Sequence, residues 1–313
     1  MKFNLFPTPR LIGIDIQSDW LKVVILRKTR QAWVLENAGA AQIPPEIVSE
    51  GKIRHFDKIS AILLDLMRAL AVNQERVAIS LPAMLVRMQR LTLPACLTEA
   101  EIETDILLHL QRDLPVTQDT LCMDYAVISS AGSIEADIFF AAVRQEHLLH
   151  YVDCIQTTGL RVKRVDVDVL ALLRATHYGA PFITHEGELN ALAYINNNMI
   201  LLIIMDERQI VFHQQWEMLN AADLLLQLKT SVHLCLASQR RNALNKIGMI
   251  GMTAEQQSAA EMTKHSWCAE IVFLTPLARF EKSEVIEDAL FKANPNAFLI
   301  ACGTAMQEIP RWL

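Results

Sequence analysis

The stretch Leu11-Ile-Gly-Ile-Asp-Ile-Gln-Ser-Asp-Trp-Leu-Lys-Val-Val24 contains two apolar runs separated by a short polar turn. Large apolar and β-branched residues dominate both runs, which favours two strands joined as a hairpin. A third strand is predicted over 32–40, so the chain opens with a three-stranded meander. A helix over 58–70, with apolar residues at helical spacing, and a strand over 76–81 follow it.

One carboxylate, Asp15, stands inside the first apolar run, just before the turn at Gln17–Asp19. A buried carboxylate is costly unless a cation or hydrogen-bond donors satisfy it. Asp15 is therefore a candidate for facing a metal ion or a phosphate. The alternative is that Asp15 only accepts hydrogen bonds from the N–H groups of its own turn.

The order of elements repeats in the second half of the chain. Strands are predicted over 189–195, 199–205 and 209–216, a helix over 221–242, and further strands over 246–251 and 270–274. Two copies of one α/β design predict two lobes, and duplicated lobes commonly hold a ligand cleft between them. A length of 313 residues is enough for two such lobes.

Residues 88–160 interrupt this repeat with elements in a different order. A strand is followed by a helix that Thr98 and Glu101 open as a capping box, then by two long strands and a second helix. We expect an inserted α+β subdomain here. The predicted organisation is a first lobe over 1–87 and 161–188, the inserted subdomain over 88–160, and a second lobe over 189–313.

Composition and charge narrow the class of protein. Hydrophobic residues make up 52% and charged residues 20%, which excludes a disordered chain. The net charge of −6 lacks the basic surplus of a nucleic-acid binder. No apolar run approaches the roughly 20 residues that span a bilayer, and the first residues lack the apolar core of a secretory signal, so we expect a cytoplasmic protein. The cysteines are too widely spaced for a zinc site or a disulfide framework.

Other clusters of polar residues are weaker candidates. Asp166 and Asp168 alternate along a predicted strand, so both carboxylates face one side and could bind a divalent ion. The alternative is that Asp166 faces solvent and Asp168 caps the next helix. His147 and His150 lie on the polar side of a helix without a third metal ligand. Phosphate-loop, dinucleotide, serine-hydrolase and zinc-protease motifs are absent, which removes the basis for a hydrolase or a dehydrogenase.

The opening stretch 11–24 resembles the first phosphate motif of the PilM family of actin-like proteins. Further family landmarks follow in the family's order: 77–82 with 91–94, 97–102, 114–125, 139–144, 158–160, 165–170 and 299–305. The resemblance covers about 11–305, nearly the whole chain.

The resemblance implies an α/β, actin-like (ribonuclease H-like) two-lobed fold with an inserted α+β subdomain of the FtsA type. It implies a cytoplasmic adaptor, peripheral to the inner membrane, in type IV pilus assembly or a related DNA-uptake machine. The implied partners are the N-terminal cytoplasmic tail of a PilN-like membrane protein and other pilus platform proteins, with no direct contact to nucleic acid. Membrane contact would come only through these partners. Such a protein is not an enzyme, although weak ATPase activity stays open, and its implied cofactor is ATP with Mg²⁺.

The resemblance carries the family's nucleotide-binding positions over to this sequence as one set: Asp15, Gln17, Ser18, Lys22, Asn196, Asn197, Gly303 and Thr304. Asp15 and Asp168 are the positions that would hold Mg²⁺. No partner-binding residue is assigned. The apolar strands over 88–93 and 122–127 are candidate walls of a groove for the PilN tail, which would bind as an extended peptide.

The sequence departs from the family where phosphates would bind. Gln17 replaces a glycine of the first phosphate loop, and Tyr194-Ile-Asn196 replaces Asp-Ile-Gly at the start of the second lobe. Cys302 takes the place of another glycine beside Gly303. A side chain at such a position restricts the turn and crowds a phosphate. We therefore expect a degenerate ATP site with weak or absent turnover.

Two alternatives stay open within the same fold. One is the cytoplasmic actin-like component of type II secretion (GspL-like), which normally continues into a transmembrane helix, whereas this sequence stops at Leu313. The other is a small kinase of the actin–hexokinase fold, which needs both phosphate loops and a catalytic base. The altered stretch Tyr194-Ile-Asn196 argues against the kinase.

Overall fold

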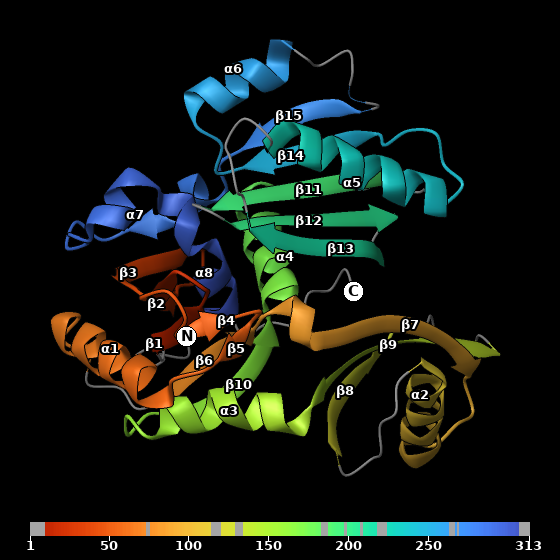
Figure 1. Cartoon of the computed structure of the whole chain (residues 1–313), viewed down its shortest axis with the longest axis horizontal. Helices are drawn as coiled ribbons and strands as arrows, with labels where there is room; N and C mark the ends of the chain where they lie inside the picture. The colour runs from red at the N-terminus through yellow and green to blue at the C-terminus, as the bar shows by residue number, and fades with distance from the viewer. Residues whose placement is uncertain are drawn as a thin grey trace, which may run out of the picture.

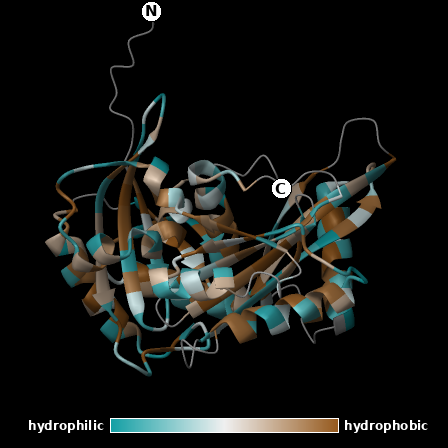
Figure 2. Cartoon of the chain, turned by 90° about the horizontal axis from the view of Figure 1, so that it is seen from above, coloured by the Kyte–Doolittle hydropathy of each residue, from teal (hydrophilic) through white to brown (hydrophobic). Residues whose placement is uncertain are grey.

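The computed structural model describes residues 10–72, 76–113, 120–128, 134–182, 187–196, 199–206, 209–217, 224–262, 267 and 269–306. Figure 1 shows two α/β lobes, one above the other, with a smaller subdomain beside the lower lobe. Apolar residues concentrate along the strands of the sheets (Figure 2), which form the buried core. Among the described residues, no helix is both long and apolar enough to cross a bilayer.

The first lobe is built on a six-stranded sheet with the order β10-β6-β1-β2-β3-β16. The predicted meander forms its centre through the antiparallel strands β1 (Arg10–Ile16), β2 (Trp20–Lys28) and β3 (Trp33–Gln42). β6 (Arg76–Leu81) and β10 (Arg161–Val167) extend the sheet in parallel beyond β1. β16 (Glu281–Lys282) pairs in parallel with β3 at the other edge.

Two pairs of helices pack against this sheet. α1 (Phe56–Ala69) contacts α3 (Gln145–Gln156), and α4 (Asp168–Gly179) contacts α8 (Leu299–Ala305). α8 lies directly against β1. A Cβ atom at Gly13 of β1 would lie 2.0 Å from the carbonyl oxygen of Ala301, so only glycine permits this approach.

The second lobe repeats the topology of the first. Its five-stranded sheet has the order β13-β12-β11-β14-β15. An antiparallel meander of β11 (Leu189–Asn196), β12 (Met199–Asp206) and β13 (Gln209–Glu217) is extended beyond β11 by the parallel strands β14 (Lys246–Ile250) and β15 (Glu270–Leu274). The helices are α5 (Leu224–Ser238) and α6 (Ala254–Met262). The predicted duplication is therefore confirmed by strand order and strand direction.

The inserted subdomain has a sheet of its own, with the order β7-β9-β8. The strands are β7 (Val86–Pro94), β8 (Leu121–Val127) and β9 (Glu135–Arg144), and α2 (Glu99–Asp113) packs on them. The capping box is present, since Glu101 Oε2 accepts a hydrogen bond from the Thr98 N–H at 2.8 Å. Its core is separate from the cores of the lobes and includes Ile102, Ile106, Leu110, Ile138 and Phe140.

The inserted subdomain ends earlier in the structure than we predicted. We predicted that this subdomain runs over 88–160, which includes α3. The buried residues of α3, however, are Tyr151, Cys154 and Ile155, which pack with α1 and the sheet of the first lobe and are not part of the subdomain's own core. The packing therefore assigns α3 to the first lobe.

The structure also corrects the assignment of 189–313 to the second lobe, because the chain returns to the first lobe after β15. The returning part consists of the 3₁₀ turns η5 (Pro276–Arg279) and η6 (Pro295–Phe298), with β16, α7 (Ala289–Ala293) and α8. Asp288 Oδ2 accepts a hydrogen bond from the Ala40 N–H at 2.9 Å, which ties this part to β3. The pairing of β16 with β3 and the complete burial of α8 also place this part of the chain in the first lobe.

Candidate functional site

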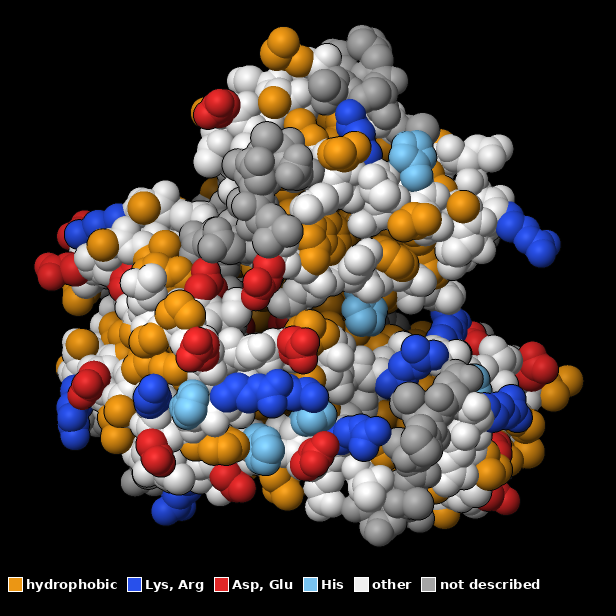
Figure 3. Space-filling model, viewed as in Figure 1, with side chains coloured by type: hydrophobic (Ala, Val, Ile, Leu, Met, Phe, Trp, Pro, Cys, Tyr) orange, Lys and Arg blue, Asp and Glu red, His pale blue; other side chains and the backbone are white. Residues whose placement is uncertain are grey.

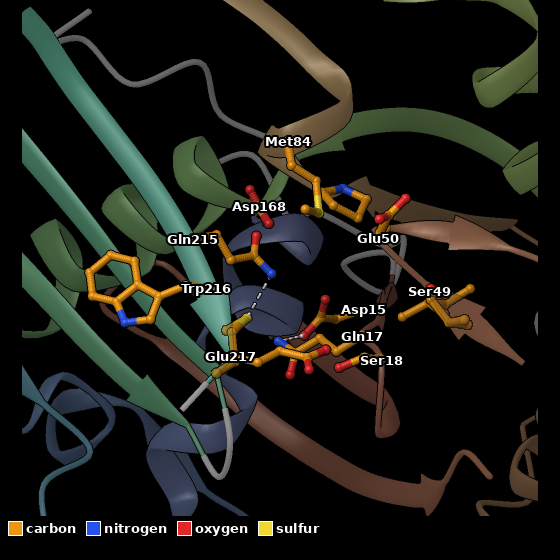
Figure 4. A pocket seen from close by; sticks show the side chains of 15 residues that line it. Asp15, Gln17, Ser18, Ser49, Glu50, Met84, Asp168, Gln215, Trp216 and Glu217 are labelled. Atoms are coloured by element: carbon orange, nitrogen blue, oxygen red, sulfur yellow. Dashed lines mark hydrogen bonds between the residues drawn. The ribbon is translucent and has the colours of Figure 1, made fainter. Parts of the chain in front are cut away.

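A cavity of about 280 Å³ lies between the two lobes. The first lobe contributes the end of β1 and its turn, the hairpin of β4 (Val48–Ser49) and β5 (Lys52–Ile53), the start of the 3₁₀ turn η1 (Ala83–Leu85), and Asp168. The second lobe contributes Met199 of β12 and the end of β13. Figure 4 shows these side chains converging from both lobes.

Carboxylates dominate the charge of this cavity. Its lining contains Asp15, Glu50, Asp168 and Glu217, and no lysine or arginine is among the described residues that line it. Figure 3 likewise shows acidic side chains along the boundary between the upper and lower parts of the molecule. The potential inside the cavity therefore favours cations over anions.

Asp15 and Lys22 form the charged centre of the first hairpin. They face each other in the register of β1 and β2, and their exposed fractions are 2% and 0%. Burial raises the pKa of Asp15 to about 6, although the charge of Lys22 and a hydrogen bond from Ser80 oppose the rise. Burial lowers the pKa of Lys22, and Asp15 opposes that fall. Each charge is thus tolerated because the other is present.

Gln17 links this pair to the second lobe. Its Nε2 donates a hydrogen bond to Asp15 Oδ2 at 2.8 Å. Its Oε1 accepts two hydrogen bonds, from Lys22 Nζ at 2.8 Å and from Asn196 Nδ2 at 3.1 Å. Gln17 and Asn196 are 7% and 1% exposed, so these bonds form away from water. One amide side chain therefore satisfies both charges and bridges the lobes.

The registers of the two hairpins show which residues correspond. Asp15 lies opposite Lys22 in the first hairpin, and Tyr194 lies opposite Leu201 at the same distance from the turn in the second. Asn196 therefore takes the place of Gln17. The Tyr194 hydroxyl donates to backbone carbonyl oxygens of η6, that of Asn296 at 3.0 Å or that of Ala297 at 3.1 Å. The second hairpin thus has no carboxylate at the position of Asp15.

Asp168 begins α4 and borders the same cavity as Asp15. Its Oδ1 accepts hydrogen bonds from the N–H groups of Val169 at 2.6 Å and Ala83 at 3.0 Å. Burial, followed by the charge of Asp15, raises the pKa of Asp168 to about 8. Across the described residues, no group of three or more His, Cys, Asp or Glu side chains is placed to hold a metal ion.

Asp166 does not share the site of Asp168, contrary to the hypothesis that the two carboxylates form a metal pair. Its Oδ2 accepts a hydrogen bond from Arg174 Nη1 at 2.6 Å, and both side chains are buried. Arg174 Nη1 also donates to the carbonyl oxygen of Gly303 at 2.7 Å. Asp166 therefore joins β10, α4 and α8 in the core of the first lobe.

The structure brings together most, but not all, of the predicted nucleotide residues. Asp15, Gln17 and Ser18 line the cavity, and Lys22 and Asn196 bond to Gln17 behind it. Asn197 lies outside the described residues.

Gly303 and Thr304 are placed elsewhere. Both lie within α8, where Thr304 is 0% exposed and its hydroxyl donates to the Ile300 carbonyl oxygen at 2.9 Å. A Cβ atom at Gly303 would lie 1.8 Å from the Ala171 carbonyl oxygen, so this glycine is needed for packing of α8 on α4. Neither residue lines the cavity.

Sequence reasoning missed Glu50, Met84, Trp216 and Glu217, which complete the cavity wall. These residues stand at turns and strand ends that carry no motif. The backbone gives one local signal, because Glu50 and Gly51 both have positive φ values of 50° and 69°, which marks a tight turn. The Tyr151 hydroxyl fixes this turn from α3 by donating to the Gly51 carbonyl oxygen at 2.8 Å.

Several solved structures are similar to this chain over nearly its full length. A chain of a PilM-PilN type IV pilus biogenesis complex superimposes with a TM-score of 0.77 at 15% identity, covering 96% of this chain and 99% of that chain. The cytoplasmic domain of EpsL, an inner membrane component of the type II secretion system of Vibrio cholerae, gives 0.52 at 13% identity and 96% of each chain. The ethanolamine utilization protein EutJ from Carboxydothermus hydrogenoformans gives 0.51 at 10% identity, covering 97% and 92%.

These superpositions, together with the duplicated strand order, show an actin-like fold. A sequence profile of the family described as type IV pilus assembly protein PilM matches residues 13–218, which is more than half of the chain. The match begins in β1, includes the whole inserted subdomain and ends after β13. The chain therefore belongs to the PilM family of type IV pilus assembly proteins.

Proposed function

We propose that this protein is an adaptor of the inner-membrane platform in type IV pilus assembly, and that it binds the N-terminal cytoplasmic tail of a PilN-like membrane protein. The observation that carries the proposal is the TM-score of 0.77 to a chain of a PilM-PilN complex, over 96% of this chain. The protein would work at the cytoplasmic face of the membrane and contact the membrane only through its partners.

The inserted subdomain offers a suitable surface for such a tail. β9 is the central strand of its sheet, so β7 and β8 are both edge strands. An edge strand presents backbone N–H and C=O groups that an extended peptide can pair with, while alternate side chains enter pockets. In Figure 3 a notch separates the second lobe from this subdomain. These strands contain the candidate groove walls over 88–93 and 122–127.

We also propose that the interlobe cavity is a degenerate ATP site with weak or absent turnover. A nucleoside triphosphate in this cavity would lie beside four carboxylates, and no lysine or arginine is among the described residues that line it. Lys22, the one matching basic residue, is 0% exposed and already donates to Gln17. Asp15 and Asp168 are the residues that would hold Mg²⁺ if a nucleotide entered, and they lack a third ligand in the described part of the chain.

Calorimetric titration of the purified protein with a synthetic PilN-type tail peptide tests both parts. We expect micromolar binding that is the same with and without Mg-ATP, and no binding of a scrambled peptide of equal composition. Binding that requires Mg-ATP would overturn the degenerate site and leave the adaptor. Absence of binding under both conditions would overturn the adaptor itself.

A further inference from the structure

We infer that the interlobe cavity is a binding site for an alkylguanidinium cation, the group that an arginine side chain or a free small molecule of the same chemistry carries. The inference goes beyond the adaptor role and does not depend on it, because it rests only on the groups that line the cavity. The cavity volume of about 280 Å³ is at the lower end of the range for ligand pockets, which suits a ligand of side-chain size.

The lining of the cavity has a surplus of hydrogen-bond acceptors. Asp168 is 5% exposed, and within the described part of the chain only its Oδ1 accepts hydrogen bonds, so its Oδ2 has no partner there. Gln215 Oε1 is a second buried acceptor, and it too lacks a partner among the described residues. Figure 4 shows both side chains among those that converge on the cavity. A buried acceptor without a donor is costly, and a ligand that brings N–H groups removes that cost.

The nitrogen donors of the lining side chains do not fill this need, because each already donates to another group of the chain. Gln17 Nε2 and Trp216 Nε1 have side-chain acceptors at 2.8 and 3.0 Å. Gln215 Nε2 donates to the sulfur of Met199 at 3.1 Å, which orients the amide with its oxygen as the unpartnered end. The missing donors must therefore come from water or from a ligand.

The charge of the cavity favours a cationic ligand. Lys22 balances Asp15, but the other three carboxylates of the lining, Glu50, Asp168 and Glu217, form no ion pair with any residue that the structure describes. Glu50 and Glu217 are exposed, whereas Asp168 is buried. Negative charge thus extends from the solvent-exposed rim to the interior, and it would draw a cation inward.

The arrangement of the acceptors selects among cations. A metal ion is not favoured, because no group of three His, Cys, Asp or Glu side chains in the described ranges is placed to hold one. Guanidinium is planar, carries five N–H donors and no acceptor, and is hydrated more weakly than ammonium, so it suits separated acceptors in a partly buried site. Its alkyl stem would pack on Pro82, Met84 and Met199, and Met84 is 51% exposed without such a cover.

Calorimetric titration of the full chain with butylguanidinium chloride tests the inference, and butylurea, which is neutral and similar in shape, is the control ligand. At about pH 9 the Asp168 carboxylate is ionised before ligand is added, because burial and the charge of Asp15 give it a pKa of about 8. At constant ionic strength we expect a Kd for butylguanidinium of about 1 mM or tighter, at least about tenfold below that of butylurea. Equal affinities for the two ligands, or no binding of butylguanidinium, would overturn the inference.

Two variants locate the ligand in the cavity. Asp168→Asn removes the buried charge, keeps an oxygen for the Ala83 and Val169 N–H groups, and should weaken butylguanidinium binding at least about tenfold. Gln215→Leu removes the unpartnered acceptor without changing the charge and should weaken binding about fivefold. Asp65→Asn, at an exposed position on α1, is the matched control and should bind like the unmodified chain. Unchanged affinity in the first two variants, or an equal loss in the control, would contradict a site in this cavity.

A measurement on the unmodified chain does not depend on the variants being stable. With ¹³C-labelled methionine methyl groups, the NMR signals of Met84 and Met199 should shift in a saturable way with butylguanidinium and stay in place with butylurea. Met262, which is exposed on α6, is the internal control and should not respond. Signals of Met84 and Met199 that do not move, or that move no more than the signal of Met262, would overturn the inference.

A second ligand decides the source of the guanidinium group. A peptide of one arginine between two glycines, with blocked ends, carries the group on a polypeptide backbone, whereas butylguanidinium does not. Equal affinity for the two would point to an arginine side chain of a protein partner, and binding of butylguanidinium alone would point to a free small molecule. Failure of the PilN-type tail peptide to bind would refute the adaptor and leave this result unchanged, because the guanidinium titrations use no tail peptide.

Discussion

The hairpins at the start of the two lobes share one backbone plan and differ in chemistry. In the first, Asp15 faces Lys22 and receives a hydrogen bond from Ser80 of the neighbouring β6. In the second, Tyr194 faces Leu201, and its neighbour on β14 is Ile250. All six side chains named here are at most 2% exposed, so their burial is equal and only their polarity differs. The duplicated sheet therefore tolerates either two opposite charges or a tyrosine facing a leucine at the same place.

This difference means that the two lobes present different chemistry to the cleft between them. In the first hairpin, Lys22 donates its hydrogen bond to Gln17. In the second, the Tyr194 hydroxyl donates to the backbone of η6. Gln17 and Asn196, at two positions where the family resemblance led us to expect glycine, bond to each other across the cleft. Side chains at the turns of the two hairpins thus join the lobes.

The largest effect should come from moving the first hairpin's carboxylate into the second. Tyr194→Asp buries a carboxylate opposite Leu201 and beside Ile250, where no cation or hydroxyl balances it. We expect a loss of about 4 kcal/mol or more in the free energy of unfolding, measured by urea denaturation. Adding Leu201→Lys restores the arrangement of Asp15 and Lys22 and should recover at least about 1 kcal/mol.

The Tyr194→Asp and Leu201→Lys variants also test whether the two hairpins are structurally equivalent. A single variant within about 1 kcal/mol of the unmodified chain would mean that water reaches Tyr194. Failure of Leu201→Lys to improve the single variant would mean that the matching registers do not place the two groups within reach of each other.

A smaller effect is expected from Asp168, which should make the free energy of unfolding depend on pH in a defined direction. Its pKa of about 8 in the folded protein is above its ordinary value of 3.8, so the folded state binds more protons than the unfolded state between these values. Stability must then fall as the pH rises, by up to about 1.4 kcal/mol per pH unit between pH 6 and 8. Asp168→Asn keeps an oxygen to accept from Ala83 and Val169 and should flatten this part of the stability profile.

Asp15 and Lys22 also have shifted pKa values, so they contribute to the same pH dependence of stability. Asp15, with a pKa of about 6, acts in the same direction mostly below pH 7, whereas the lowered pKa of Lys22 acts in the opposite direction. The difference between Asp168→Asn and the unmodified chain isolates Asp168 from both. Asp65→Asn, at an exposed position on α1, is the matched control and should leave the pH profile unchanged. Parallel profiles for Asp168→Asn and the unmodified chain would show that Asp168 is ionised at neutral pH.

The same two hairpins show what a sequence can and cannot reveal. The strands were predictable because their apolar runs and polar turns are local patterns, and the repeat made the second lobe predictable from the first. Asp15 was found as a carboxylate in an apolar run. The bond from Asn196 to Gln17 was not predictable, because it joins residues 179 positions apart and depends on how the lobes meet.

The predictions for residues 299–305 and for the end of the second lobe also failed because they depend on contacts between distant parts of the chain. Residues 299–305 match a family loop that we expected to contact a nucleotide through Gly303 and Thr304, yet they form α8, which is buried between β1 and α4. The same return of the chain explains why the second lobe ends before Pro276. The position of α8 and the end of the second lobe both follow from packing against the distant sheet of the first lobe. No local pattern in 276–306 predicts that packing.

The smallest effect tests whether the phenol of the second hairpin has a structural role of its own. Tyr194→Phe keeps the buried ring and removes only the hydroxyl, which leaves the Asn296 and Ala297 carbonyl oxygens without this donor. We expect a loss of about 1 kcal/mol in the free energy of unfolding, and faster hydrogen exchange confined to η6 and α8. Tyr125→Phe in the inserted subdomain is the control and should change neither. If exchange in η6 stays the same, the hydroxyl does not hold the returning chain on the second lobe, and the two hairpins differ only in the charge that the first retains.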